Sequence, residues 1–450
     1  MRELEQRFAD EVVVVGVHSG KYIAERDTAR ILEAAIRLGN AHPIVNDRQF
    51  RVWRSYAVRA WPTLVVVDPQ GYAVASHAGE FTAAMIAPVV ERLIADAEAG
   101  GFLDRAPRHF SADPPAIAPG TLRYPGKVAL GPPPAERGGS RRRIAVADTG
   151  HHRILVGTLS DDGRRMTVDR VVGSGDAGLR DAADPREARF TLPNGMAFAD
   201  PSGGNGAGVL YVADSGNHAL RAVELPSGAV RTLAGTGRRV RTRADREAGA
   251  LASPWDLALV GTTLHVAMAG SHQLWALDLA SGRLRVHAGQ GGEDIRDGAL
   301  GEALLAQPMG LAADPGAGRL YFVDAESSAV RWADLDPAGE VHTIVGTGLF
   351  DFGDADGVGD AVRMQHQQGI ALHDSGGRLL VADSYDDALK WVDPATRRAE
   401  TWVRGFHEPG GLAIGGQGLV YVADTNAHRV AVVAESGEIG ELEIEKLPAP

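Results

Sequence analysis

The chain has 450 residues, 44% of them hydrophobic, and a formal net charge of −12 at pH 7. This length allows two or more domains. The acidic balance argues against nucleic acid as a partner, because surfaces that bind nucleic acid are basic. The sequence contains no cysteine, which excludes disulfides, thiolate metal sites and thiol catalysis by these residues. No apolar run is long enough to span a membrane, and the charged start differs from a signal peptide. We therefore expect a cytoplasmic protein.

Residues 1–100 show strands alternating with helices, which predicts an α/β domain. Continuous apolar runs at Val12–Val17 and Thr63–Val67 are typical of strands that are buried on both faces. Apolar residues at helical spacing predict helices over Ala24–Leu38 and from about Thr82 to Ala99. Shorter elements are expected between them: a strand at Ile44–Val45, a helix at Phe50–Tyr56 and a strand at Ala73–Ser76.

A proline opens the second apolar run, in the sequence Trp61-Pro62-Thr63. This segment resembles the cis-proline turn of thioredoxin-like proteins, which in those proteins faces the redox cysteines and holds the backbone of the substrate. A cis bond is found at only about 5–6% of X-Pro positions in folded proteins and is rarely accidental. The alternative is a trans proline at an ordinary strand start.

A proline-rich linker is expected over residues 101–121, and a repeat region follows over residues 122–447. One short phrase returns six times: a strand that ends in an acid, a turn of small polar residues, and a second apolar strand. The first copy begins Val146-Ala147-Asp148, and the others begin at Val212, Val266, Val323, Val381 and Val422. Copies spaced by roughly 40 to 65 residues fit one four-stranded blade each. The sequence therefore predicts a six-bladed β-propeller.

A second repeated column lies upstream of each phrase, where the innermost strand of each blade starts. Proline occupies this point in five copies and Gln367 in the other. Proline cannot donate to a ladder and belongs at the first residue of a strand. Innermost strands line the channel of a propeller, and ligands bind at its mouth. The residues just before this column form a candidate ring at that mouth: Tyr124, Leu192, Ser253, Gln307, His366 and Glu408.

This candidate ring contains one histidine and one carboxylate, His366 and Glu408. Zinc catalysis generally uses three protein ligands and an open site, and these two residues, even with His407, fall short of that set. The mixed ring suits a polar peptide or a small ligand better than a hydrolytic centre, and it disfavours catalysis of the lactonase or lyase type. We expect no metal, no cofactor and no catalytic residue.

Two further columns are assigned structural roles. An Asp at the end of a strand accepts hydrogen bonds from the turn that it begins. One copy has Met268 instead, which a turn tolerates and a ring of metal ligands does not. These turn acids are Asp148, Asp214, Asp324, Asp383 and Asp424. The histidines of the last column are expected to pack between strands, with Ser328 and Asp387 substituting for them: His152, His218, His272 and His428.

Together the two regions resemble the NHL repeat-containing protein 2 family, in which a thioredoxin-like domain precedes an NHL-repeat propeller. The matching segments are Val15–Ser19, His42–Asp47, Trp61–Leu64, Tyr124–Val128, Ala147–Ile154, Ser253–Asp256, Ala267–Gly270 and Phe352–Gly359. Family members carry a Cys-containing motif just upstream of the helix that here begins at Met1, and an additional β-rich tail domain. Neither is among these 450 residues. The resemblance implies a mainly β protein with an incomplete thioredoxin-like fold followed by a six-bladed NHL propeller.

The resemblance also implies a gap in the first sheet. In a thioredoxin-like sheet, the strand that leads into the Cys motif lies between the strands expected at Val12–Val17 and Thr63–Val67. Either these two strands pair directly, or the natural protein starts upstream of Met1. We expect the upstream start, because an unpaired central edge invites aggregation.

The expected function is non-catalytic binding, in which the propeller presents a rigid face to a protein or peptide partner. No nucleic-acid or membrane partner is expected, and a monomer is favoured. The resemblance implies an alternative, a thiol-disulfide or peroxide-linked oxidoreductase whose Cys motif lies upstream of Met1, because such chemistry needs a thiolate. We expect the propeller to close by pairing a strand near Leu122–Leu130 with the C-terminal segment Val430–Leu447.

Overall fold

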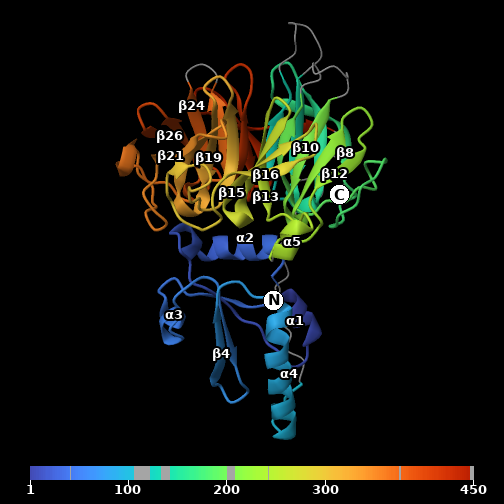
Figure 1. The fold of residues 1–450 in the computed structure, drawn as a ribbon, viewed down its shortest axis with the longest axis vertical. Coiled ribbons are helices and arrows are strands. Elements are labelled where there is room, and N and C mark those ends of the chain that lie inside the picture. Colours follow the sequence, from blue (N-terminus) through green and yellow to red (C-terminus); the bar gives the residue numbers. More distant parts are fainter. Residues whose placement is uncertain are drawn as a thin grey trace. The chain divides into compact units, whose positions relative to one another are not determined.

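The computed structural model describes residues 1–40, 42–105, 122–132, 142–199, 208–241, 243–373 and 377–445. It divides into two compact units, Met1–Ala116 and Ile117–Pro450. The boundary falls within the predicted linker at 101–121, of which residues 106–121 lie outside the described residues. In Figure 1 the first unit is coloured in blues, and the second runs from green to red.

The first unit alternates helices with short strands. Its elements are α1 (Arg2–Arg7), β1 (Gly16–His18), α2 (Thr28–Leu38), β2 (Ile44–Asn46), α3 (Arg51–Ser55), β3 (Thr63–Val67), β4 (Ala73–Ala78) and α4 (Ala83–Ala99). Strand β1 pairs with β2 in parallel, and β3 pairs with β4 in antiparallel fashion. Within the described residues these are two separate sheets. The thioredoxin-like assignment of this unit stays a prediction.

Local capping sets the bounds of the two long helices. The Asp27 side chain accepts hydrogen bonds from the N–H groups of Ala29 and Arg30, so α2 begins at Thr28 rather than at the predicted Ala24. The helix ends at Gly39, whose φ of +64° is left-handed and favours glycine. Thr82 caps α4 in the same way, by accepting the N–H of Met85.

The strand predicted at Val12–Val17 is shorter in the structure. Only its end finds a partner strand, since β1 begins at Gly16 and pairs with β2. Val12 instead donates its N–H to the carbonyl of Phe8 at 2.9 Å, which continues the turn after α1. Direct pairing of this segment with β3, one of the two arrangements considered, does not occur among the described residues.

The second unit contains six sheets whose innermost strands contact one another in a closed circle, which confirms the predicted six-bladed propeller. From the channel outward, the first three blades contain β5 (Lys127–Leu130), β6 (Arg143–Asp148), β7 (Arg153–Leu159) and β8 (Arg165–Val172); β9 (Pro193–Phe198), β10 (Val209–Asp214), β11 (Ala219–Glu224) and β12 (Val230–Ala234); and β13 (Pro254–Val260), β14 (Thr263–Met268), β15 (Gln273–Asp278) and β16 (Leu284–Ala288). The short helix α5 (Arg243–Glu247) precedes blade 3.

Blades 4 to 6 repeat this order. They contain β18 (Pro308–Asp314), β19 (Arg319–Asp324), β20 (Ala329–Asp334) and β21 (Glu340–Val345); β23 (Gly369–His373), β24 (Arg378–Asp383), β25 (Ala388–Asp393) and β26 (Arg398–Arg404); and β27 (Pro409–Ile414), β28 (Val420–Asp424), β29 (Arg429–Val433) and β30 (Ile439–Glu441). Two short strands extend blades 4 and 5 at their outer edges: β17 (Gly298–Ala299) and β22 (Gly357–Val358).

The core of the propeller lies in the seams between blades. One cluster joins blades 1 and 6 through buried side chains such as Val146 and Tyr421, and another joins blades 4 and 5 through Val323 and Ile370. A blade cannot bury both of its faces alone, so each is stabilised by its neighbours and the ring must close.

The prediction that the propeller closes by pairing a strand near Leu122–Leu130 with the C-terminal segment is wrong. The last strand, β31 (Glu443–Glu445), pairs in parallel with β8, the outermost principal strand of blade 1. Strand β5, from the region predicted to take the C-terminal segment, lies nearest the channel and pairs with β6. The additional strand therefore joins blade 1 at its outer edge, beside β8, and not beside β5.

Candidate functional site

The residues of the candidate ring share a left-handed backbone at the start of each innermost strand, with φ between +47° and +67°. This conformation turns each N–H toward a side chain of the preceding blade. The hydrogen bonds run from Leu192 to His152 (3.1 Å), Ser253 to His218 (3.0 Å), Gln307 to His272 (3.1 Å), His366 to Ser328 (3.4 Å), Glu408 to Asp387 (3.0 Å) and Tyr124 to His428 (3.1 Å). Every blade is thereby tied to the next, and the circle closes between blades 6 and 1.

The accepting side chains also sit on left-handed residues. Together the donors and acceptors make up twelve of the sixteen non-glycine residues with positive φ among the described residues. Such a conformation costs on the order of 1–3 kcal/mol for a non-glycine residue and persists only where surrounding contacts fix it. The histidine column therefore does more than pack, because its Nδ1 atoms accept hydrogen bonds. Ser328 and Asp387 can replace histidine because their side chains also offer a hydrogen-bond acceptor. The predicted packing role did not account for these replacements.

An accepting Nδ1 requires a neutral imidazole ring. Burial, together with the nearby positive charges of Arg239 and Arg241, lowers the pKa of His218 to about 4. Burial likewise lowers the pKa of His152 and of His428. These rings therefore keep an Nδ1 lone pair available for the inter-blade hydrogen bonds at neutral pH.

The turn acids also act at the start of the innermost strands. Oδ1 of Asp148 accepts the N–H of Arg123 at 2.7 Å, and the other four acids accept the corresponding N–H groups of their own blades. All five are fully buried. Their second oxygen meets a cation on the third strand of the blade: Arg153, Arg221, Arg331, Lys390 and Arg429. Each acid thus joins the inner strand to the third strand, a wider role than that of a turn.

The side chains of the candidate ring differ in their exposure. Tyr124 and Glu408 are each only 6% exposed, and Tyr124 packs against His428 with ring centroids 4.5 Å apart. Leu192, Ser253, Gln307 and His366 are half-buried. The ring residues are brought together at one end of the channel through their backbones, but they do not form a uniform polar mouth.

A buried ion pair spans the channel, and sequence reasoning missed it. Lys127 Nζ on β5 of blade 1 donates to Asp256 Oδ2 on β13 of blade 3 at 2.7 Å, and both side chains are less than a tenth exposed. The same carboxylate oxygen accepts the N–H of Leu311 in blade 4 at 3.0 Å. The equivalent residues of the other four blades are all glycine: Gly195, Gly310, Gly369 and Gly411.

These glycines let the innermost strands approach closely. A Cβ on Gly369 would lie 2.3 Å from the carbonyl oxygen of Gly410, and one on Gly411 would lie 2.2 Å from Lys127 Cδ. At this level the channel is therefore occupied by the backbones of the innermost strands and by the Lys127–Asp256 ion pair.

The seam between blades 4 and 5 carries the most distinctive polar group near the ring. The His366 ring is stacked on Tyr385, with centroids 4.6 Å apart and planes at 13°. His366 Nε2 lies 3.5 Å from Glu326 Oε1. Beside them, burial raises the pKa of Asp386 to about 6. All four side chains are half-buried, so their outer atoms can meet a ligand while the seam fixes their positions.

In the first unit, the Trp61–Pro62 peptide bond is cis. Trp61 Nε1 donates to the Ser19 carbonyl at 2.8 Å, and Thr63 Oγ1 donates to the Ala60 carbonyl at 2.7 Å. Trp61 also packs against Trp53, with centroids 4.4 Å apart, and nearly half of its surface is exposed. The predicted turn thus belongs to an aromatic cluster.

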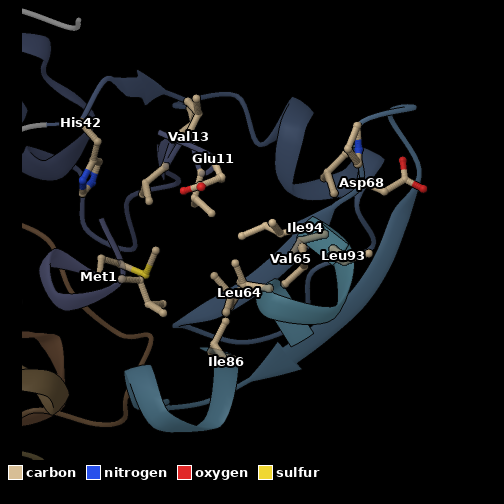
Figure 2. Close-up of a pocket in the computed structure, with 18 of the residues that line it drawn as sticks. Met1, Glu11, Val13, His42, Leu64, Val65, Asp68, Ile86, Leu93 and Ile94 are labelled. Carbon is tan, nitrogen blue, oxygen red and sulfur yellow. The ribbon is translucent and has the colours of Figure 1, made fainter. Parts of the chain in front are cut away.

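A cavity of about 780 Å³, shown in Figure 2, is lined in part by Pro62 and Thr63 of this turn. The segment Val12–Val17 lines one wall, and residues Pro62–Pro69 line another. Helix α4 contributes Ile86, Val90 and Leu93. Sequence reasoning anticipated a gap between the two apolar runs, and the structure places this cavity between them.

Comparison with known proteins was made at three levels. The NHL repeat model matches residues 406–433. NHL repeat-containing protein 2 of Gallus gallus is 34% identical over 492 residues, covering 96% of this chain and 63% of the relative. Protein SUPPRESSOR OF QUENCHING 1, chloroplastic, of Arabidopsis thaliana is 33% identical over 480 residues, covering 99% of this chain and 44% of the relative. A crystal structure of a nidogen/laminin complex superposes with a TM-score of 0.45 at 14% identity, covering 66% of this chain and 93% of that one.

The chain therefore spans less than two thirds of the length of these curated relatives. No helix in the described parts of the chain is long and apolar enough to cross a membrane. The same residues contain no group of three or more His, Asp or Glu side chains placed to hold a metal ion.

Proposed function

Because the chain is homologous along nearly its whole length to NHL repeat-containing protein 2 and Suppressor of Quenching 1, we propose that it is a non-catalytic binding scaffold. Its propeller presents the face where the innermost strands begin to a protein or peptide partner. Propellers with NHL repeats commonly interact with proteins, and the present fold fits that role. The partner meets a face that is ordered in advance, which lowers the entropic cost of binding.

One observation carries the proposal: at the seam between blades 4 and 5, both partners of a repeated inter-blade hydrogen bond differ from the repeat. At four other seams, a Ser or Thr hydroxyl donates to the carbonyl of the residue at the proline column: Thr149 to Pro193, Ser215 to Pro254, Ser384 to Pro409 and Thr425 to Pro125. Blades 3 and 4 have Ala269 and Ala325 in place of that hydroxyl. The partner of Ala269 in blade 4 is still a proline, Pro308, whereas blade 5 has Gln367 in place of the proline. Gln367 Nε2 instead donates to the Ser328 carbonyl at 3.1 Å.

A seam that breaks its own repeat pattern is a candidate for function, because structural consistency is given up mainly where function requires it. The side chains here suit a polar peptide. Tyr385 and His366 offer rigid aromatic surfaces with polar edges, and residues of this kind often dominate binding energy at interfaces. Glu326 and Asp386 add carboxylates, which favours a partner segment with a basic or hydrogen-bond-donating residue.

The channel itself supports binding rather than chemistry. Lys127 and Asp256 neutralise each other at its centre, so neither offers a free acid or base. The alternative of thiol-based oxidoreduction requires a thiolate, and none of the 450 residues is a cysteine. We therefore assign no such activity to these residues.

Site-specific photocrosslinking tests the proposal. A benzophenone amino acid at Tyr385 in the full chain, expressed in its own host, should yield discrete crosslinked species, whereas the same probe at Val286 on the outer strand of blade 3 should not. The purified partner should then bind Y385A at least tenfold more weakly than wild type by calorimetry, and should bind the outer-strand control R285A equally well. Equal crosslinking at both positions, or equal affinity for Y385A and wild type, would refute the proposed face.

A further inference from the structure

Blade 5 has a pair of carboxyl groups where two other blades have an acid and a hydrogen-bonding partner for it. The residue three positions after the turn acid is His151 in blade 1 and Asn217 in blade 2, and each side chain meets Oδ2 of its turn acid, at 2.9 and 2.8 Å. In blade 5 this residue is Asp386. Its carboxyl group is in hydrogen-bonding contact with that of the turn acid Asp383, which is fully buried.

The cation of blade 5 does not hydrogen-bond to this turn acid. In four other blades an arginine donates to Oδ2 of the turn acid at 2.7–2.9 Å. Lys390 takes that place in blade 5, but its Nζ donates to Asp354 at 2.8 Å and lies 3.4 Å from Asp383 Oδ2. Within the part of the chain that the structure describes, Asp383 Oδ2 and Asp386 Oδ2 are therefore buried without a donor.

A single proton would satisfy both of these oxygens. A buried acceptor without a donor is costly, and two carboxylates in contact resist ionising together. A protonated carboxyl group is itself a donor, so a proton held between the two Oδ2 atoms replaces the donor that His151 and Asn217 supply in their blades.

The balance of charge around the pair agrees with one bound proton. Blades 2 and 4 each set one arginine against two carboxylates. Blade 5 sets two cations, Lys390 and Arg404, against four carboxylates: Asp354, Asp356, Asp383 and Asp386. One proton on the pair gives the group in blade 5 the same net charge as the groups in blades 2 and 4.

The pair also holds the residue next to the aromatic stack. Asp383 Oδ1 accepts the N–H of Gln365 at 2.7 Å, and Asp386 Oδ1 accepts the side-chain amide of the same residue. Tyr385 donates its N–H to the Gln365 carbonyl at 3.1 Å. His366, which follows Gln365, stacks on Tyr385. A change of charge on the pair therefore acts one residue away from the stack.

We propose that Asp383 and Asp386 form a proton switch beside the aromatic stack, holding one proton at neutral pH and two in mildly acidic solution. The second proton removes one negative charge from this seam. Burial raises the pKa of Asp386 to about 6, and burial together with the charge of Asp386 raises the pKa of Asp383 well above its usual range. Because the two groups interact, both steps belong to the pair rather than to either residue.

The charged groups that face the pair from other elements keep their charge over this range. Asp354 and Asp356 lie just before β22, Lys390 lies on β25 and Arg404 ends β26. Despite burial, hydrogen bonds from Arg404 and Lys390 lower the pKa of Asp354, and those from Thr401 lower the pKa of Asp356. Hydrogen bonding to Asp354 raises the pKa of Arg404, and the neighbouring carboxylates raise that of Lys390 against the effect of burial.

Potentiometric titration of the full chain counts the protons. A carboxyl group with a pKa of about 6 takes up about 0.8 proton between pH 7 and pH 5, whereas an ordinary aspartate takes up less than about 0.1. Wild type should therefore take up about 0.8 proton more than D386N, which copies the asparagine of blade 2. D386S, which copies Ser327 of blade 4, should show the same loss. D360N removes an exposed carboxylate of blade 5 and should match wild type.

A fluorotyrosine at position 385 reports whether the switch reaches the stack. Histidines ordinarily titrate near pH 6.5, so the readout must separate the pair from His366. We expect the fluorine resonance of wild type to shift with a midpoint near pH 6, and we expect D386N to lose this step while retaining His366. Equal proton uptake by wild type and D386N overturns the proposal. A fluorine step that persists in D386N, or its absence from wild type, does so as well.

Neither measurement requires a partner. The switch can therefore fail while the proposed binding face is confirmed by crosslinking, and the reverse is equally possible.

Discussion

Replacing Lys127 should destabilise the propeller more than removing a charged side chain from the exposed surface. In the K127M variant, the Asp256 carboxylate keeps its hydrogen bonds from the N–H groups of Leu311 and Leu257 but loses its only described cation at 2.7 Å. The Asp256 side chain is just 4% exposed, so water cannot replace the lysine. The variant leaves an uncompensated buried charge in the centre of the ring.

Breaking a buried ion pair on one side costs about 3–5 kcal/mol. The unfolding entropy is about 2.1 cal/mol/K per residue, so a unit of roughly 330 residues, as here, has an unfolding entropy of about 0.7 kcal/mol/K. The expected loss then lowers the Tm of the propeller by about 4–7 °C. Adding D256N to K127M removes the orphaned charge while keeping an acceptor for Leu311, and should recover at least half of the loss.

Differential scanning calorimetry of the full chain measures these shifts. R285M removes a charge from the exposed outer strand of blade 3 and should change stability by no more than about 0.5 kcal/mol. The reasoning fails if K127M melts within 1 °C of R285M, or if the double variant is less stable than K127M, because the carboxylate would then not depend on the lysine.

Three further outcomes follow from the ring. Because the folded-state pKa of His218 is lowered from 6.5 to about 4, its contribution to stability is full above pH 6.5 and falls as the pH drops towards 4; H218S should flatten that part of a denaturation series, and an unchanged slope would assign the titration elsewhere. The pKa of Asp386 is raised to about 6, so its ionisation opposes folding, and D386N should be more stable than wild type at pH 7 but not at pH 4, as chemical denaturation at the two pH values would show. G369A, whose Cβ would lie 2.3 Å from a backbone oxygen, should lose about 1–3 kcal/mol in thermal melts; G301A, which meets nothing within 4 Å, should be nearly neutral, and equal melting of the two would contradict the close approach of blades 5 and 6.

Repeats made the number of blades predictable. A blade buries its faces only against its neighbours, so each copy carries the same apolar strands and the same closing turn, and six copies predict six blades. The closing strand was not predictable in the same way. Residues Glu443–Glu445 lie outside the repeat and are mostly charged, and their parallel pairing with β8 depends on where the finished ring leaves a free edge.

The contacts of the candidate site depend on features that local patterns do not encode. Lys127 and Asp256 are separated by 129 positions, and only the ring geometry brings them together. The inter-blade hydrogen bonds depend on the left-handed backbone conformation at these positions. Histidine, serine and aspartate all adopt it there, although their side chains differ. By contrast, the strand predicted at Val12–Val17 was too long. A continuous apolar run indicates residues suited to burial, whereas strand pairing also requires the edge of a neighbouring strand.

The arrangement of strain argues for a rigid binding face. Twelve left-handed non-glycine residues cluster where the innermost strands begin, and the same residues form the hydrogen bonds that hold neighbouring blades in register. The residues that carry the backbone strain also form the hydrogen bonds that offset it. A blade therefore cannot relax alone without breaking its contacts on both sides. Among the described residues, the seam between blades 4 and 5 has Gln367 in place of the usual proline, with its amide donating to the Ser328 carbonyl, and adds a stacked His366–Tyr385 pair. A partner that binds there meets groups fixed by the whole ring, so affinity should respond to changes at the other seams through stability rather than through direct contact.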